Sequence, residues 1–134
     1  MSTTGNPYGH LVLRGGNRGT NYHPEAIASA AAELSKAGLP DRLMVDCSHG
    51  NSNKDYRRQS EVLQAVADQV RQGSNHVMGV MLESHLVEGN QKLSADRSAM
   101  TYGQSVTDAC ISFDTTAELL DQLAAAVAAS RTAA

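Results

Sequence analysis

The sequence predicts an α/β fold in which parallel strands alternate with helices. Three short apolar runs have the composition of buried strands, near residues 10–14, 42–48 and 77–83. Three segments with apolar residues at helical spacing follow, near 24–37, 54–72 and 115–129. Strands and helices in this order imply parallel strands joined by right-handed crossovers. At 134 residues the chain has room for one domain, 1–134.

The first strand and helix are delimited by glycine and proline. The apolar run 10–13 ends in Arg14-Gly15-Gly16, which is typical of a strand followed by a glycine turn. Pro24 suits the first position of a helix, and Gly38 is expected to end it.

The second unit begins with RLMVDCSHGNSN at 42–53. Its apolar run ends in polar side chains, and Asn51-Ser52-Asn53 offers oxygen atoms that could cap a helix. We therefore predict a strand that delivers His49 to its carboxyl end, followed by a helix with Asp55 in its first turn.

The third apolar run leads directly into Glu83-Ser84-His85. The polar stretch 87–107 that follows is longer than a usual connection, which predicts a functional loop or lid. A short apolar segment, 108–113, precedes the last helix, for which Thr115 and Glu118 form a predicted capping box.

The composition excludes several classes of partner. The formal charge is −3 and the basic residues are scattered, so a nucleic-acid ligand is not expected. No apolar run reaches the roughly 20 residues of a membrane span, and residues 1–5 lack a signal-peptide pattern, so we expect a cytoplasmic protein. Cys47 and Cys110 lack CxxC spacing and are predicted to be free thiols.

Each predicted strand ends in a chemically capable residue: Arg14, His49 and Glu83. Because the carboxyl ends of parallel strands lie on one side of a sheet, these groups are expected along one rim. Histidine and carboxylate groups bind first-row metals, and Asp108 could supply another carboxylate. Arg14 with its glycines suits an anion, since the guanidinium forms two parallel hydrogen bonds and glycine lets backbone N–H groups approach.

Each of these residues also has a structural interpretation. His49 alone could be a hydrogen-bonded structural residue, Glu83 a solvated loop residue and Asp108 a helix cap. Cys47 lies two positions before His49, where a thiolate could bind a metal, but a small buried thiol is the favoured interpretation. The remaining candidates are interpreted as solvated or have no predicted partner: His85, Glu88, His10, His23 and His76.

Several long motifs resemble the C-terminal part of type I 3-deoxy-D-arabino-heptulosonate-7-phosphate (DAHP) synthase. They are LRGG at 13–16, MVDCSHGNSNKDYRRQ at 44–59, GVMLESHLVEGNQ at 79–91 and YGQSVTDACISF at 102–113. The resemblance covers nearly the whole chain and implies a partial TIM (β/α)₈ barrel, about the last three βα units. It also implies a transferase that condenses phosphoenolpyruvate, erythrose 4-phosphate and water to DAHP and phosphate, the first step of the shikimate pathway to aromatic amino acids.

The resemblance implies roles for four residues of this chain. His49, Glu83 and Asp108 correspond to ligands of a divalent metal (Mn, Fe, Co or Zn), and Arg14 corresponds to a residue that binds phosphoenolpyruvate. The family's fourth metal ligand is a cysteine from an N-terminal region that has no counterpart here.

Two interpretations of the chain follow from the resemblance. The first is that it is part of a DAHP synthase, an enzyme expected to be a homo-oligomer when intact. The alternative is a catalytically inactive remnant or a complementing half of a split enzyme that needs a partner chain to supply the N-terminal half. Either way, we expect the isolated chain to be inactive. A different metal-dependent aldolase on a barrel is disfavoured by the length of the matched motifs.

Overall fold

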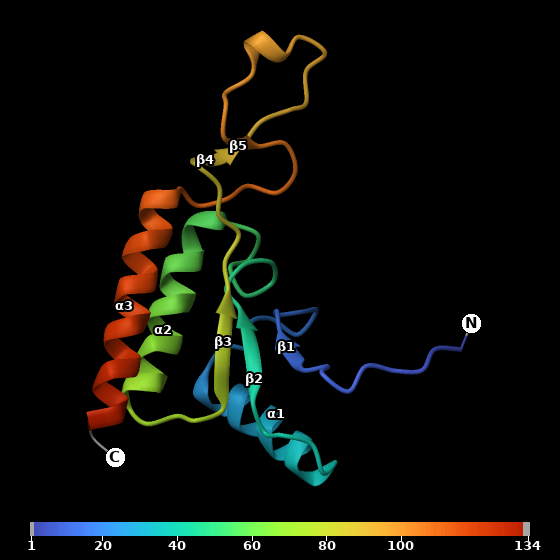
Figure 1. The fold of residues 1–134 in the computed structure, drawn as a ribbon, viewed down its shortest axis with the longest axis vertical. Coiled ribbons are helices and arrows are strands. Elements are labelled where there is room, and N and C mark those ends of the chain that lie inside the picture. Colours follow the sequence, from blue (N-terminus) through green and yellow to red (C-terminus); the bar gives the residue numbers. More distant parts are fainter. Residues whose placement is uncertain (1, 133–134) are drawn as a thin grey trace.

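A computed structural model describes residues 2–132, which form a three-stranded parallel sheet with helices packed on it (Figure 1). The strand order is β1-β2-β3, and the neighbours run in parallel. The strands are β1 (Leu11–Leu13), β2 (Leu43–Asp46) and β3 (Val77–Met81). The predicted α/β class with parallel strands is therefore confirmed.

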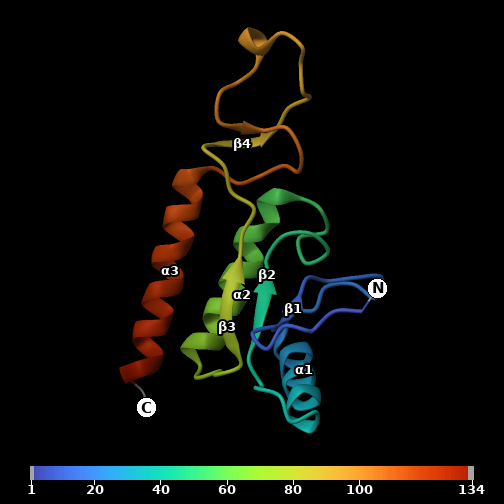
Figure 2. The same ribbon diagram turned by 45° about the vertical axis from the view of Figure 1, so that its right-hand side comes forward.

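Three α-helices pack on one face of the sheet. They are α1 (Pro24–Lys36), α2 (Gln59–Arg71) and α3 (Phe113–Thr132), and α2 and α3 lie side by side (Figure 2). Leu43 and Val45 of β2 point toward these helices and are fully buried. Side chains of all three helices join them in one core, which includes Ile27, Val62, Leu63, Val66 and Leu119.

The opposite face of the sheet lacks such a cover. Alternate residues of a strand point to opposite faces, and on this second face Val12 lies in register with Met44 of β2, which pairs with Gly79 of β3. Val12 is 39% exposed. Within residues 2–132, β1 and β3 each have one strand neighbour in this sheet. The sheet thus presents an apolar face and an unpaired outer edge at β1.

The first helix ends as its sequence predicts. Gly38 adopts the left-handed conformation (φ 72°), and the N–H groups of Gly38 and Leu39 donate to the carbonyls of Ser35 and Leu34 at 3.0 Å each. This pair of bonds is the Schellman motif, which satisfies carbonyls at a helix end.

The second helix begins differently from the prediction. Residues 56–58 form a 3₁₀ turn, η1 (Tyr56–Arg58), whose first turn is capped by Asp55 through the Arg57 N–H at 3.1 Å. The α-helix starts only at Gln59. Asn51 and Ser52 do not cap it, because their side chains bond within and beside the β2 end instead.

The last helix begins two residues before the predicted capping box. Its first residue is Phe113, and Ser112 accepts the Thr115 N–H through its hydroxyl at 3.1 Å. Ser112 therefore takes the capping role assigned to Thr115, because residues 110–111 are tied to the sheet and leave the helix free to start immediately afterwards.

The long segment after β3 contains local structure. It includes β4 (Val87–Asn90), the 3₁₀ turn η2 (Arg97–Ala99) and β5 (Gln104–Ser105), and β4 and β5 pair in parallel. Figure 1 shows this segment projecting beyond the carboxyl end of β3. Within residues 2–132, no helix is long and apolar enough to cross a membrane.

The uncovered sheet predicts self-association of the purified chain. Unpaired strand edges pair with strands of other chains, and exposed apolar faces associate to leave water. Val12→Lys places a charge on the uncovered face of the edge strand β1 and should shift the chain toward monomer in light scattering over a concentration series. The matched control is Leu120→Lys, which charges an exposed position of α3. A monomeric wild-type chain at every concentration, or equal effects of both variants, would contradict this prediction.

Candidate metal centre

Four residues predicted as functional, three at strand ends and Asp108 beside the last apolar segment, line one cavity. Arg14, His49, Glu83 and Asp108 surround a space of about 250 Å³ at the carboxyl ends of the strands. Its remaining lining is Ser48, Gly50, Lys54, Tyr56 and Ala109. A guanidinium, an imidazole and two carboxylates therefore face a volume suited to a small polar ligand.

Three of these residues bring metal-competent atoms together. One ligand atom from each of His49, Glu83 and Asp108 lies within 4.8 Å of the other two. The His49 Nε2 atom is 3.7 Å from Glu83 Oε1. His49 and Glu83 are partly buried and Asp108 is exposed, so the group is open on one side. An imidazole nitrogen with two carboxylates is a donor set that suits divalent first-row metals.

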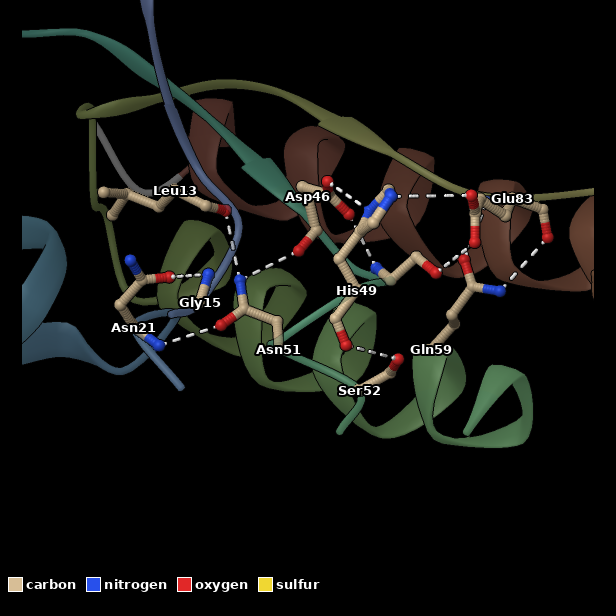
Figure 3. Close-up of polar contacts among 10 residues, drawn as sticks. Leu13, Gly15, Asn21, Asp46, His49, Asn51, Ser52, Gln59 and Glu83 are labelled. Carbon is tan, nitrogen blue, oxygen red and sulfur yellow. Dashed lines mark hydrogen bonds and ion pairs between the residues drawn. The ribbon is translucent and has the colours of Figure 1, made fainter. Parts of the chain in front are cut away.

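The Nδ1 side of the His49 ring faces Asp46, the last residue of β2. Asp46 is 3% exposed, and its Oδ2 atom lies 2.8 Å from His49 Nδ1 (Figure 3). Asp46 Oδ1 accepts the Ser48 N–H at 2.8 Å, which fixes the carboxylate. The contact with His49 lacks hydrogen-bond geometry, so Nδ1 is a buried atom without a hydrogen-bond partner in residues 2–132. The ring presents Nε2 to Glu83.

Glu83 is held by two polar side chains from the segment after β2. Ser48 Oγ donates to Glu83 Oε2 at 2.5 Å. The amide of Gln59 accepts the Glu83 N–H at 2.7 Å and donates to the Glu83 carbonyl at 3.1 Å. Gln59 has no exposed surface. Both the carboxylate and the backbone of Glu83 are thus anchored (Figure 3).

Asn51 connects the ends of β1 and β2. Its side-chain N–H₂ group donates to the carbonyls of Leu13 at 3.1 Å and Asp46 at 2.8 Å, and its Oδ1 accepts the Asn21 N–H at 2.8 Å. Asn21 in turn accepts the Gly15 N–H at 2.7 Å. This fully buried amide therefore fixes the backbone on both sides of Arg14.

Two glycines allow the backbones after β1 and β2 to touch. A Cβ on Gly15 would lie 2.5 Å from the carbonyl carbon of Gly50, and one on Gly50 would lie 2.9 Å from that of Gly15. Gly15 also has a positive φ of 72°. Since both separations are too short for any side chain, this contact requires glycine at both positions. It places Arg14 and His49 side by side.

Asp108 reaches the cavity because the following residues pair with the chain beyond β3. The Ile111 N–H donates to the Glu83 carbonyl at 3.0 Å, and the His85 N–H donates to the Ile111 carbonyl at 3.0 Å. Ser84 and Ile111 form a parallel bridge. The apolar segment 108–113 thus behaves as the start of a further strand beside β3.

Neither cysteine belongs to the group of possible ligands found in residues 2–132. Cys47 has no exposed surface, and burial, together with the nearby Asp46 charge, raises its pKa to about 12. Burial also raises the pKa of Cys110, with smaller contributions from Glu83 and Asp108. Cys47 is therefore the small buried thiol favoured by its sequence.

The other candidate residues lie outside the cavity lining. His85 and Glu88 are on the chain leading into and along β4, and His85 Nδ1 accepts the Leu86 N–H at 2.9 Å. His76 contacts Asp41, with Nδ1 3.4 Å from Oδ2, and His23 contacts the Thr20 hydroxyl. His10 precedes β1 and is exposed.

Most of the residues that support the site carry no local sequence pattern that predicts their role. Ser48, Lys54 and Tyr56 line the cavity, whereas Asn51 and Gln59 act from beneath it. One signal was present: residues 46–59 hold more small polar and amide side chains than a helix start requires. Their partners, up to 38 positions away, could not be found in a local pattern.

Comparison with known proteins gives consistent matches over nearly the whole chain. The model of the DAHP synthetase I family matches residues 1–121. The chain is 51% identical over 123 residues to a Tyr-sensitive phospho-2-dehydro-3-deoxyheptonate aldolase of Salmonella typhimurium, which covers 92% of this chain and 34% of the relative. It is 48% identical over 132 residues to a putative phospho-2-dehydro-3-deoxyheptonate aldolase of Schizosaccharomyces pombe, with 98% and 36% covered.

A solved structure agrees with these matches. The phospho-2-dehydro-3-deoxyheptonate aldolase of Francisella tularensis superposes with a TM-score of 0.88 at 45% identity, and the match covers 97% of this chain and 37% of that one. The chain spans about a third of the length of the curated relatives it matches.

The buried amide of Gln59 predicts a stability difference within one helix. Gln59→Ala removes two hydrogen bonds and leaves the Glu83 N–H without its partner, although the Glu83 carbonyl keeps the bond from Ile111. The loss should lower the free energy of unfolding by about 2 kcal/mol. The matched control is Gln64→Ala in the same helix, where the exposed amide bonds Asp68. We expect the control to change stability by less than about 0.5 kcal/mol. Urea denaturation measures both, and equal losses would contradict the anchoring role of Gln59.

Proposed function

The chain belongs to the DAHP synthetase I family, and from this membership we propose that it forms the metal centre and part of the substrate site of a DAHP synthase. The reaction is the condensation of phosphoenolpyruvate with erythrose 4-phosphate and water to give DAHP and phosphate, at the start of the shikimate pathway. The observation that carries the proposal is the convergence of Arg14, His49, Glu83 and Asp108 on one cavity.

The proposed architecture is the last three βα units of a TIM barrel. The helices cover one face of the parallel sheet and leave the other uncovered, as in one part of a barrel wall. The cavity lies at the carboxyl ends of the strands, where such barrels build their active sites. The bridge between Ser84 and Ile111 supports the start of a further strand in the same direction.

The proposed ligands of a divalent metal are His49, Glu83 and Asp108. The positions of their donor atoms support this assignment. Their donor atoms already lie within 4.8 Å of one another. His49 turns Nδ1 toward the buried Asp46 carboxylate and Nε2 toward Glu83, so the second ring nitrogen faces the acceptor that a metal-binding histidine needs. A divalent ion bound there supplies Lewis acidity to the aldehyde oxygen of erythrose 4-phosphate. The donor set accommodates Mn, Fe, Co or Zn, and a cysteine is the expected fourth ligand.

Arg14 is the proposed phosphoenolpyruvate-binding residue of this chain. Its guanidinium is always charged and can donate two parallel hydrogen bonds to a carboxylate or phosphate. The glycine contact with Gly50 and the Asn51 and Asn21 amides hold its backbone beside His49. Arg14 would thereby orient the anionic substrate next to the metal ligands.

A second candidate function is that of a non-catalytic remnant or a complementing half. One observation favours it: within residues 2–132 the sheet keeps an apolar face and an unpaired β1 edge. A partner chain that supplies the N-terminal half would cover both surfaces and bring the missing ligand and phosphate-binding residues.

Metal binding by the purified chain tests the proposed centre. We expect Mn²⁺ binding, measured by electron paramagnetic resonance of the free ion, to be lost in His49→Ala. Asp46→Asn removes the charge behind the ring and should weaken binding by about 10- to 100-fold. Asp41→Asn is the control, since Asp41 contacts His76 outside the cavity. Unchanged Mn²⁺ binding in His49→Ala would refute the assignment.

Complementation separates the two candidate functions. We expect no phosphate release from phosphoenolpyruvate and erythrose 4-phosphate by this chain alone with Mn²⁺, because most of both substrate sites lies outside it. Co-expression with the N-terminal two-thirds of the Escherichia coli Tyr-sensitive relative should generate activity that Glu83→Gln abolishes. Turnover by the chain alone would contradict the requirement for a partner, and an inactive but co-purifying pair would favour the remnant.

A further inference from the structure

The cavity contains two cations without a carboxylate partner. Arg14 and Lys54 both line it. Within residues 2–132, the arginine–carboxylate ion pairs are those of Arg58 in η1 and Arg71 in α2, and lysine forms none. The positive charges of Arg14 and Lys54 are therefore available to a ligand, although Glu83 and Asp108 share the same cavity.

Lys54 is held at the cavity by an unusual backbone. The non-glycine residues with positive φ in residues 2–132 are His49 (48°), Asn53 (53°) and Lys54 (63°), all between β2 and α2. Figure 1 shows this loop curling beside the carboxyl end of β2. The Lys54 N–H donates to the His49 carbonyl at 2.8 Å and the Asn53 N–H to the Gly50 carbonyl at 3.2 Å.

The left-handed backbone is favourable for Asn53 but unfavourable for Lys54. Asn53 takes the position after a helix-like turn where asparagine is common. Lys54 follows in the same conformation without the short polar side chain that makes it favourable. Glycine would adopt this backbone at no steric cost. A lysine at this position therefore costs conformational free energy that a glycine would not. What the lysine adds in return is its ammonium group.

The charges of the cavity indicate what the ammonium meets. Glu83 and Asp108 balance Arg14 and Lys54, so a divalent ion held by the proposed ligands makes the lining positive by two charges. A positive, partly enclosed lining attracts an anion. Lysine is a compact, strongly charged donor that suits phosphate oxygens, complementing the planar guanidinium of Arg14.

We propose that Lys54 is a second anion-binding residue of this site and that, with Arg14, it holds the phosphate group of a phosphorylated substrate beside the metal. The inference rests on the proposed function, because the metal ligands and Arg14 define the site that it extends. Lys54 combines this left-handed backbone with a place in the cavity lining.

The test compares anion affinity with stability in the full chain. Phosphorus NMR titrations in the presence of Mn²⁺, with inorganic phosphate and phosphoenolpyruvate as probes, measure affinity in wild type, Lys54→Gly and Lys54→Arg. Lys54→Gly should weaken the binding of both probes by about tenfold, through loss of a charge-assisted hydrogen bond. It should also raise the urea midpoint, because glycine relieves the left-handed strain. Lys54→Arg should restore most of the affinity.

The control for overall charge is Lys92→Gly, an exposed lysine in the segment between β4 and β5, which should leave binding unchanged. Wild-type affinity in Lys54→Gly would overturn the inference. If Arg14→Met weakens binding while Lys54→Gly does not, only the role of Lys54 falls. If neither Mn²⁺ nor Arg14→Met affects anion binding, both the role of Lys54 and the proposed function are contradicted.

Discussion

The site depends on how the polar segment between β2 and α2 satisfies the backbone at three strand ends. Asn51 bonds the carbonyls of Leu13 and Asp46, and Gln59 bonds both backbone groups of Glu83. Both amides are fully buried, and a buried polar group that loses its partner costs free energy. The segment therefore cannot shift without breaking several hydrogen bonds at once. This fixes the positions of the residues at the strand ends relative to one another.

The close contact between the Gly15 and Gly50 backbones lies beside the hydrogen bonds of Asn51. Gly15 and Gly50 touch, and the Asn51 N–H donates to the Arg14 carbonyl at 3.2 Å beside that contact. A side chain at either glycine would separate the loops and pull the Asn51 bonds apart. The position of Arg14 relative to His49 is thus determined twice, by steric exclusion and by hydrogen bonding.

Several charged side chains lie close together at the carboxyl ends of the strands, which favours the binding of charged ligands. Asp46, Glu83 and Asp108 gather near one imidazole, and like charges at close range raise the free energy unless a cation lies between them. A metal ion held as proposed would relieve that repulsion and leave the positive charges of Arg14 and Lys54 to bind an anion. The loop that carries His49 and Lys54 also contains the left-handed residues, which fits the tendency of backbone strain to collect at functional sites.

The sequence by itself determined the alternation of strands and helices and the residues at the strand ends. Arg14, His49 and Glu83 could be predicted to share a rim because parallel strands end on one side of a sheet. Local patterns failed where long-range partners intervened: Asn51 looked like a helix cap, yet it bonds a carbonyl 38 positions away. Thr115 likewise lost its capping role to Ser112 once residues 110–111 were tied to the sheet.

Only the tertiary structure decided which polar groups support the rim. Ser48 and Gln59 reach Glu83 across 35 and 24 positions, and Lys54 reaches the cavity through a backbone conformation that its residue type does not favour. Strand register and side-chain direction set these contacts, and both arise from packing of the whole sheet against its helices. The sequence therefore specified the chemical groups of the site, whereas their orientation and support came from the fold.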